Sequence, residues 1–301
     1  MKDATNARWV LIVKMAMRIA RRCVAPYAAR RSRHDFTQPQ LIACLVLKAV
    51  TRHDYRGVCA LLTLAPALRE AMGLEKVPHW TTLQKFMARS HVPQIVDQMI
   101  GEILKEVGLS DRPSVIAVDS TALQCGVASL HYQRRQEERQ PKRRGNGSGT
   151  GKIRKTVKVS VAVVCGALLP VALMVDMGSS ADMQQMPALM ERIEQRTTPS
   201  HLLCDSAYDA EWVHTTARER WQAQSVIPPV VRTRDGTIKT KWRAQMQMQM
   251  QKRPAIYGQR WHVESFMSAF KRTMHPTLSS RSARLLLAEA SMKVLAYAIR
   301  R

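Results

Sequence analysis

The hydrophobic pattern of the chain changes near residue 114, and this change limits what the chain can fold into. Before that point, apolar residues recur at helical spacing. Thr37 and Pro39 are typical of a helix start, and Thr81 is expected to cap a later helix. The sequence therefore predicts an all-helical region over residues 1–110. Short helices of this kind suit a DNA-reading module and a plain helical cap equally well.

Beyond residue 114 the sequence has short runs of β-branched and apolar residues, which are typical of strands. Three of them are "SVIAVDSTAL", "TVKVSVAVVCG" and "LLPVALMVDMG", the last two joined by a turn near Gly166. A helix ("PALMERIEQR"), a strand ("HLLCDS"), a helix ("AEWVHTTARERW"), a strand ("QSVIPPVV") and a final helix follow. This order predicts an α/β layer arrangement for residues 111–301.

Two basic insertions interrupt this order, at about 134–156 and 232–253. The first is Gly-rich and is predicted to be a loop. Its "GNGSGTGK" run resembles a phosphate-binding loop, but Asn146 and Ile153 stand where that motif needs Gly and Ser or Thr, so no ATP site is predicted. The second insertion alternates Gln and Met, which favours either a strand or a flexible arm.

The charge of the chain indicates its partner. Lys and Arg number 47 against 23 Asp and Glu, a formal net charge of +24. So many positive charges repel one another unless a polyanion binds to them. Nucleic acid is therefore the favoured partner, and an anionic membrane surface is the alternative. No apolar run approaches the roughly 18 residues that span a bilayer, and no signal peptide is predicted. The six cysteines lack metal-ligand spacing and indicate reduced thiols in a cytoplasmic protein.

The segment from 257 to 271, "YGQRWHVESFMSAFK", is expected to be an amphipathic helix. At about 100° per residue, its polar residues fall within roughly a quarter turn of one another. They are Tyr257, Arg260, Glu264, Ser268 and Lys271. The apolar residues form a separate stripe: Val263, Phe266, Met267, Phe270 and Met274. The polar face is either a solvated surface with an Arg–Glu pair, worth a few tenths of a kcal/mol, or part of a site.

Three acids stand out by their positions. Asp119 lies within the first strand, where an unpaired buried charge is costly, Asp205 ends the fourth strand, and Glu264 lies on the last helix. Each aspartate also has a structural interpretation: Asp119 could bond the neighbouring hydroxyls, and Asp205 could cap the next helix, a role that Asp209 could share. Carboxylates from adjacent elements suit Mg²⁺ or Mn²⁺, and a pair of such ions can cleave a phosphodiester.

The order of these strands and acids resembles the RNase H-like core of DDE transposases. The segment from 257 to 271 also matches the Y-x2-R-x3-E-x6-K signature of bacterial insertion-sequence transposases. The matching residues are Tyr257, Arg260, Glu264 and Lys271. "VDST" and "CDSAYDA" resemble the two aspartate motifs of the family, although Ser206 and Ala207 replace the usual Lys and Gly of the second. In the helical region, "VPHWTTLQKF" is similar as well.

This resemblance implies an RNase H-like mixed sheet flanked by helices and preceded by a helical region that binds DNA ends and dimerises. It implies a transposase, with metal-dependent strand cleavage at element ends and strand transfer to target DNA. Asp119, Asp205 and Glu264 would hold two Mg²⁺ or Mn²⁺ ions, and the DNA backbone would be held by Tyr257, Arg260 and Lys271. The implied partners are double-stranded DNA with terminal inverted repeats and a second copy of the chain, in the cytoplasm and associated with the nucleoid.

Other interpretations stay open. A catalytically decayed or repurposed DNA-binding protein of transposase origin would keep the charge, although the three intact acids argue against it. An RNase H-like nuclease that hydrolyses without strand transfer could have the same core. A peripheral membrane protein is disfavoured because the basic segments lack an accompanying apolar face.

Overall fold

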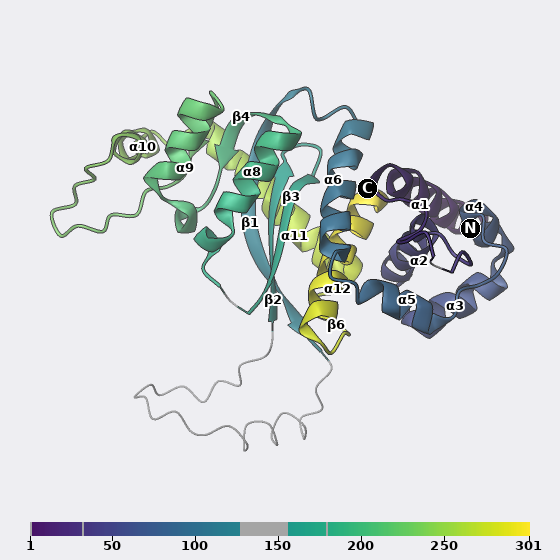
Figure 1. The fold of residues 1–301 in the computed structure, drawn as a ribbon. Coiled ribbons are helices and arrows are strands. Elements are labelled where there is room, and N and C mark those ends of the chain that lie inside the picture. The colour runs from purple at the N-terminus through teal and green to yellow at the C-terminus, as the bar shows by residue number, and fades with distance from the viewer. Residues whose placement is uncertain (1, 32, 127–155, 179) are drawn as a thin grey trace, which may run out of the picture.

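The computed structural model describes most of the chain as helices around one mixed sheet (Figure 1). The described residues are 2–31, 33–126, 156–178 and 180–301. The insertion predicted at about 134–156, with its "GNGSGTGK" run, lies outside them except for Thr156.

The N-terminal region is helical, as predicted. Its helices are α1 (Lys2–Cys23), α2 (Gln38–Thr51), α3 (Tyr55–Leu64), α4 (Pro66–Met72), α5 (Trp80–Met87) and α6 (Val92–Glu106). Thr37 caps α2: its hydroxyl accepts from the Gln40 backbone N–H at 3.3 Å, and the Gln40 side chain accepts from the Thr37 N–H at 2.8 Å. The predicted cap at Thr81 is wrong. His79 caps α5 instead, because its ring nitrogen accepts from the Thr81 N–H at 3.4 Å and the helix begins earlier.

The sheet confirms the predicted α/β class. Its strands are β1 (Pro113–Cys125), β2 (Thr156–Val164), β3 (Leu169–Met177), β4 (Thr198–Leu203), β5 (Gln224–Val226) and β6 (Thr277–Leu278). They lie in the order β3-β2-β1-β4-β5, with β6 paired to β1. β1, β2 and β3 pair antiparallel, whereas β4 and β5 add in parallel, so the sheet is mixed. The turn near Gly166 is present, with a positive φ of 82° that glycine adopts without strain.

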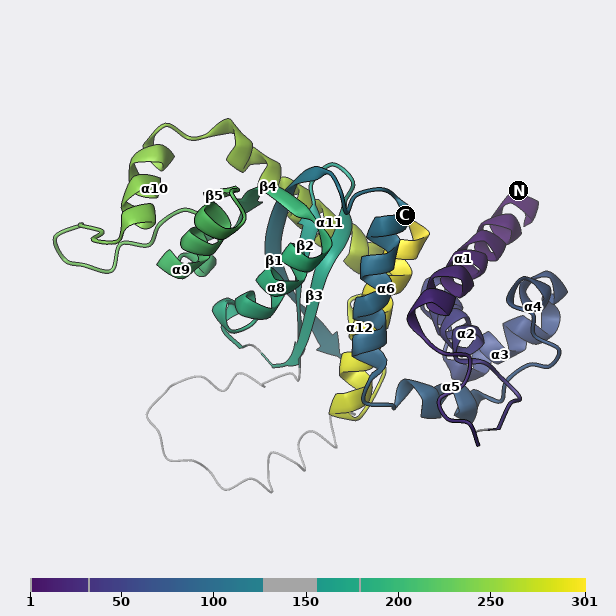
Figure 2. The ribbon, with the colours of Figure 1, turned by 45° about the horizontal axis from the view of Figure 1, so that its top comes forward.

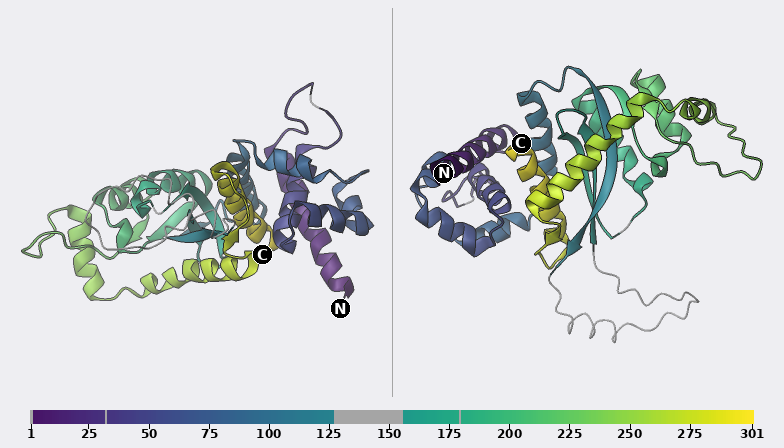
Figure 3. Two further views of the ribbon diagram at one scale, coloured as in Figure 1. Left: turned by 90° about the horizontal axis from the view of Figure 1, so that it is seen from below. Right: turned by 180° about the vertical axis from the view of Figure 1, so that it is seen from behind.

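Helices cover both faces of this sheet. The helices after β3 are α8 (Met186–Arg196), α9 (Glu211–Thr215), α10 (Lys241–Gln251), α11 (Trp261–Met274) and α12 (Ala283–Arg300), of which α10 packs on α9 beyond the end of the sheet (Figure 1). Views from the front and from behind show α8 on one face and α11 crossing the other (Figures 1 and 3). Short helical turns connect them: η1 (Asp182–Gln184), η2 (Ser206–Tyr208), η3 (Thr216–Arg220) and η4 (Ala255–Arg260).

The second insertion, at about 232–253, contains a helix rather than the predicted strand or flexible arm. Its Gln–Met run forms most of α10. Gln, Met, Ala, Lys and Arg are strong helix formers, and the run has no β-branched residue to favour a strand. The carboxylate of Glu211 also accepts from the N–H groups of Trp242 and Arg243 in the first turn of α10, at 2.9 and 3.1 Å. Tertiary contacts of this kind override an alternating pattern.

The core on the α11 side of the sheet extends into the N-terminal helices. One hydrophobic cluster there joins Ile42 of α2, Val96 of α6, Phe266 of α11 and Leu295 of α12. α12 packs against both α2 and α6, and the C-terminus lies close to α6 (Figure 2). The helical region and the sheet therefore share a core on this face, while α8 packs over a separate cluster on the other.

Candidate active site

The alternation of side chains along the strands puts two of the acids on the same face of the sheet. Ala117 and Leu203 belong to the hydrophobic cluster on the α11 side. Successive side chains of a strand alternate between its faces, so Asp119, two residues after Ala117, faces α11 as well. Asp205 follows Leu203 by two residues, just beyond the end of β4, and β4 pairs in parallel with β1.

Helix α11 brings the third acid to this face. Its predicted apolar stripe is buried in the core: Val263, Phe266, Met267, Phe270 and Met274. Glu264 lies on another side of the helix, with a side chain that is 53% exposed. The α-helix begins at Trp261, so Tyr257 and Arg260 lie in the preceding turn η4 and not in one continuous helix. Residues 3 and 4 apart still meet across this junction, as the ion pair between Arg260 and Glu264 shows.

Arg260 lies between two of the acids. Its guanidinium pairs with the carboxylate of Glu264, and its Nη1 is 3.7 Å from Oδ2 of Asp119. The Arg260 side chain is 21% exposed, so it is largely enclosed rather than spread over the surface of the helix. Arg260 therefore links Asp119 of β1 to Glu264 of α11, so its contacts are not confined to one helix.

The pKa of the Asp119 carboxyl is raised overall by its surroundings. Burial raises the pKa of Asp119 most; a backbone hydrogen bond and Arg260 lower it, and Asp205 and Glu264 raise it again. Each of these acids therefore adds a like charge to the surroundings of Asp119. Because like charges repel, positive charge placed among these carboxylates would stabilise them.

The cationic and aromatic residues of the predicted site divide into two groups. Tyr257 lies with the acids: burial raises its pKa most, Arg260 lowers it and Asp205 raises it. Lys271 lies in the last turn of α11, half-buried, and none of the contacts among the described residues joins it to the acids. The structure thus brings Tyr257 and Arg260 to the acids and leaves Lys271 farther along the same helix.

Asp205 has the structural role that the sequence left open. Its Oδ1 accepts from the Ala207 N–H at 2.9 Å and caps the short turn η2. This bond holds the carboxylate at the end of β4 and uses one of its two oxygens. Capping and ligand binding are therefore compatible at this residue.

Asp209 does not cap the next helix, a role that the sequence left open for it. It pairs instead with Arg243, which was not predicted. Its side chain is fully buried, and it accepts from Nε and Nη2 of Arg243 at 2.8 and 2.7 Å and from the Val230 N–H at 2.7 Å. Burial raises the pKa of Asp209, but these hydrogen bonds outweigh burial and hold the pKa below its ordinary value. The pair fastens α10 to the segment that follows Asp205.

The residues present fit a divalent cation by their chemistry. Asp119, Asp205 and Glu264 offer hard oxygen ligands, which suit Mg²⁺ or Mn²⁺, and their mutual repulsion favours added positive charge. Among the described residues, however, no group of three His, Cys, Asp or Glu side chains is close enough together to hold an ion. In this structure Arg260 supplies positive charge beside the acids.

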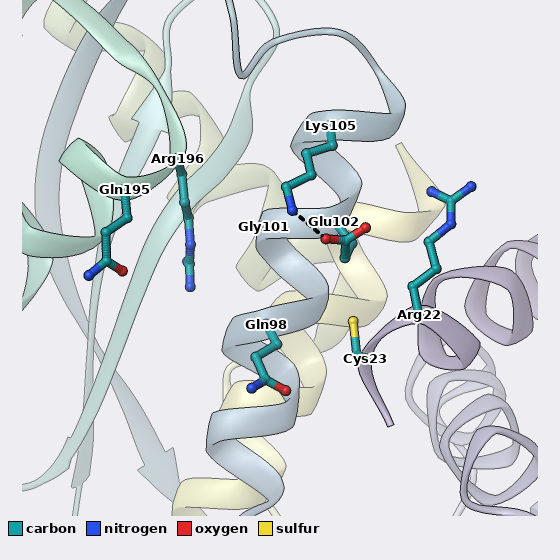
Figure 4. Close-up of a pocket in the computed structure, with 8 residues that line it drawn as sticks. All are labelled: Arg22, Cys23, Gln98, Gly101, Glu102, Lys105, Gln195 and Arg196. Carbon is teal, nitrogen blue, oxygen red and sulfur yellow. Dashed lines mark hydrogen bonds and ion pairs between the residues drawn. The ribbon is translucent and has the colours of Figure 1, made fainter. Parts of the chain in front are cut away.

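A pocket elsewhere in the molecule does not include the three acids. It lies between α1, α6 and α8 and is lined by Arg22, Cys23, Gln98, Gly101, Glu102, Lys105, Gln195 and Arg196 (Figure 4). Its cations already have acidic partners: Arg22 with Glu106, Lys105 with Glu102, and Arg196 with Asp97. This pocket is therefore a polar junction between helices.

Comparison with known proteins identifies the family. No curated protein matches the chain. Within the described residues, no helix is both long and apolar enough to cross a membrane. The family described as a transposase DDE domain matches residues 110–299, a span that begins just before β1, includes all three acids and ends in α12. The chain thus belongs to the DDE transposase family.

Proposed function

We propose that this chain is a transposase that cuts DNA strands at the ends of its element and transfers the freed 3′-hydroxyl ends to target DNA. The proposal is supported by Arg260, which pairs with Glu264 and lies 3.7 Å from Asp119, and by the place of Asp205 just beyond the strand that pairs with β1. These acids come from β1, the end of β4 and α11, and the family match spans all three elements.

The acids would hold the divalent ions. When bound, two Mg²⁺ or Mn²⁺ ions supply an activated oxygen nucleophile and stabilise the leaving oxygen of a phosphodiester. Asp119 lies in β1, and Asp205 lies just beyond the end of β4, the parallel neighbour of β1. The Glu264 side chain is 53% exposed, against 23% for that of Asp119.

The cations of α11 and η4 would hold the DNA backbone. A guanidinium offers a planar fork of donors that matches a phosphate group. The Arg260 guanidinium pairs with Glu264 and lies 3.7 Å from Asp119. We infer that it turns to the phosphate when ions neutralise those acids. Tyr257 packs beside it, and Lys271 adds a charge farther along the same helix.

The charge of the whole chain supports DNA as the partner. The net charge of +24 comes mainly from the helical region and the two basic insertions, at about 134–156 and 232–253. We propose that residues 1–110 bind the DNA ends and dimerise, and that residues 111–301 carry out catalysis. Joining two DNA ends requires two active sites, which favours a homodimer on DNA in the cytoplasm, associated with the nucleoid.

The affinity for DNA is expected to fall steeply with salt. About five phosphate contacts or more would give a slope of about −4.5 or steeper in a plot of log K against log salt concentration. A fluorescence anisotropy titration of a duplex between low and physiological salt measures this slope. A flat response would exclude phosphate contacts as the main source of affinity.

Arg260→Lys is expected to slow strand cleavage by about a hundredfold, because a misplacement of the reacting phosphate by about 1 Å costs that much in rate. Lysine keeps the charge but cannot reproduce the bidentate fork. The measurement is a cleavage assay on a duplex that carries the element ends, with a melting curve on the same sample.

The matched control for this prediction is Arg220→Lys, at an exposed pair with Glu194. That variant should cleave at the wild-type rate. If Arg260→Lys also cleaves normally and loses only tenths of a kcal/mol in stability, Arg260 is a surface partner of Glu264 and does not position the phosphate.

A further inference from the structure

A buried lysine lies on the α8 side of the sheet, on β2, which pairs with the strand that carries Asp119. Lys158 belongs to β2, and its side chain is only 8% exposed. Its Nζ is 2.6 Å from Oδ1 of Asp182 and also donates to the carbonyl oxygen of Ser180. A buried ammonium is costly unless it is paired and hydrogen-bonded, and these partners offset that cost. The pair lies on the α8 side of the sheet, away from the three acids.

The same carboxylate oxygen of Asp182 accepts a hydrogen bond from the Ser120 hydroxyl. Ser120 follows Asp119 in β1, so its side chain points to the opposite face of the sheet. Its backbone N–H donates to Oδ1 of Asp119 at 2.8 Å. Ser120 therefore donates to Asp119 through its backbone N–H and to Asp182 through its hydroxyl. We call Ser120, Lys158 and Asp182 the Asp182 network.

The Asp182 network also reaches the turn that holds Asp205. That turn, η2, contacts η1, the short helix in which Asp182 lies. Tyr208 of η2 is fully buried. Burial raises the pKa of Tyr208, and its hydroxyl makes no hydrogen bond to the described residues, so the contact between η1 and η2 is what joins this turn to Asp182. One network thus supports the strand of Asp119 and the turn of Asp205.

Asp119 needs such support because its neighbours repel it. Asp205 and Glu264 both add negative charge next to its carboxylate. A carboxylate among like charges turns away unless other contacts fix its backbone and side chain. Residues behind a metal ligand commonly fix its orientation, and their loss typically weakens metal binding or activity by about 10-fold to 100-fold.

We propose that Ser120, Lys158 and Asp182 are positioning residues that orient Asp119, and through the contact of η1 with η2 the turn of Asp205, for binding a divalent cation. The proposal rests on the proposed function of Asp119 as a metal ligand. It assigns a role to the ion pair of the buried Lys158 with Asp182, whose side chain is 27% exposed.

The test measures Mn²⁺ binding to the full-length chain by titration calorimetry, without DNA. Ser120→Ala removes the hydroxyl and leaves the Lys158–Asp182 pair intact, so the fold should persist. We expect Mn²⁺ to bind about 10-fold to 100-fold more weakly, with melting temperature and DNA affinity near those of the wild type. Ser120→Thr keeps a hydroxyl and suits a strand, and should restore Mn²⁺ affinity.

Ser160→Ala is the matched control. Ser160 pairs with Ser120 in the register of β1 and β2 and is fully buried, and its hydroxyl makes no hydrogen bond to the described residues. Its loss should leave Mn²⁺ affinity unchanged. If Ser160→Ala weakens binding as much as Ser120→Ala does, a loosened sheet explains both results and the proposal fails.

Asp119→Asn separates this proposal from the proposed function. If Asp119→Asn abolishes Mn²⁺ binding while Ser120→Ala binds like the wild type, the positioning role is wrong and the metal site stands. If neither variant weakens binding, Asp119 is not a metal ligand, and both proposals fail. A double variant, Ser120→Ala with Asp182→Asn, should bind no more weakly than Asp182→Asn alone, since residues that act as one unit are not additive.

Discussion

Asp119→Asn is expected to lower the rate of strand cleavage by about a thousandfold or more, while the affinity for DNA persists. The amide keeps the shape of the side chain but removes a hard anionic ligand. Metal ions contribute several kcal/mol to stabilising the transition state of phosphoryl transfer, and about 4 kcal/mol corresponds to a thousandfold in rate. Glu264→Gln should behave similarly. The measurement is cleavage of an end-bearing duplex in Mg²⁺, with DNA affinity measured on the same preparation.

Asp111→Asn is the matched control, because this exposed acid lies just before the strand that carries Asp119. It should cleave at the wild-type rate. Near-normal cleavage by Asp119→Asn or Glu264→Gln would remove the metal-binding role from that residue. A second assay, with DNA already cut to expose the 3′-hydroxyl, separates the transposase from a plain nuclease, since only a transposase joins that end to target DNA.

The faces on which Asp119 and Glu264 lie could be predicted because they depend on regular features of the chain. Side chains alternate along a strand, so the position of Asp119 in β1 determines its face once the apolar residues determine the core. The place of Asp205 after a parallel neighbouring strand brings it to the same part of the sheet. The helical period separates Glu264 from the buried stripe of α11. The strand alternation and the helical period are local patterns, whereas the pairing of β4 with β1 joins distant parts of the chain.

Other parts of the fold depend on contacts that no local pattern shows. α12 was not among the predicted elements, because it is apolar on nearly every side and buried along most of its length, without an amphipathic signal. The Gln–Met run lies in α10, whose first turn donates two backbone N–H groups to the carboxylate of Glu211. The Asp182 network joins Ser120 to a residue 62 positions away. Pairings of this kind become visible only when the chain is folded.

Arg243→Met is expected to destabilise the folded chain by about 3–5 kcal/mol, the usual result of breaking a buried ion pair by removing one partner. Arg243 and Asp209 have side chains that are 13% and 0% exposed, so water cannot replace the lost guanidinium at Asp209. The Val230 N–H still donates to Asp209 but leaves most of its charge uncompensated. Equilibrium unfolding in urea measures the loss as a lower midpoint at an unchanged slope.

The dependence on pH gives the prediction a second test. The folded-state pKa of Asp209 lies below its ordinary value, so the pair stabilises the fold fully above the ordinary pKa, near 3.9, and loses this contribution as pH falls through the folded-state value. Arg243→Met should therefore differ most from the wild type near neutral pH and converge with it in acid. Arg220→Met, which breaks an exposed pair with Glu194, should cost about 1 kcal/mol or less. Equal losses in Arg243→Met and Arg220→Met would mean that the buried pair does not hold α10 in place.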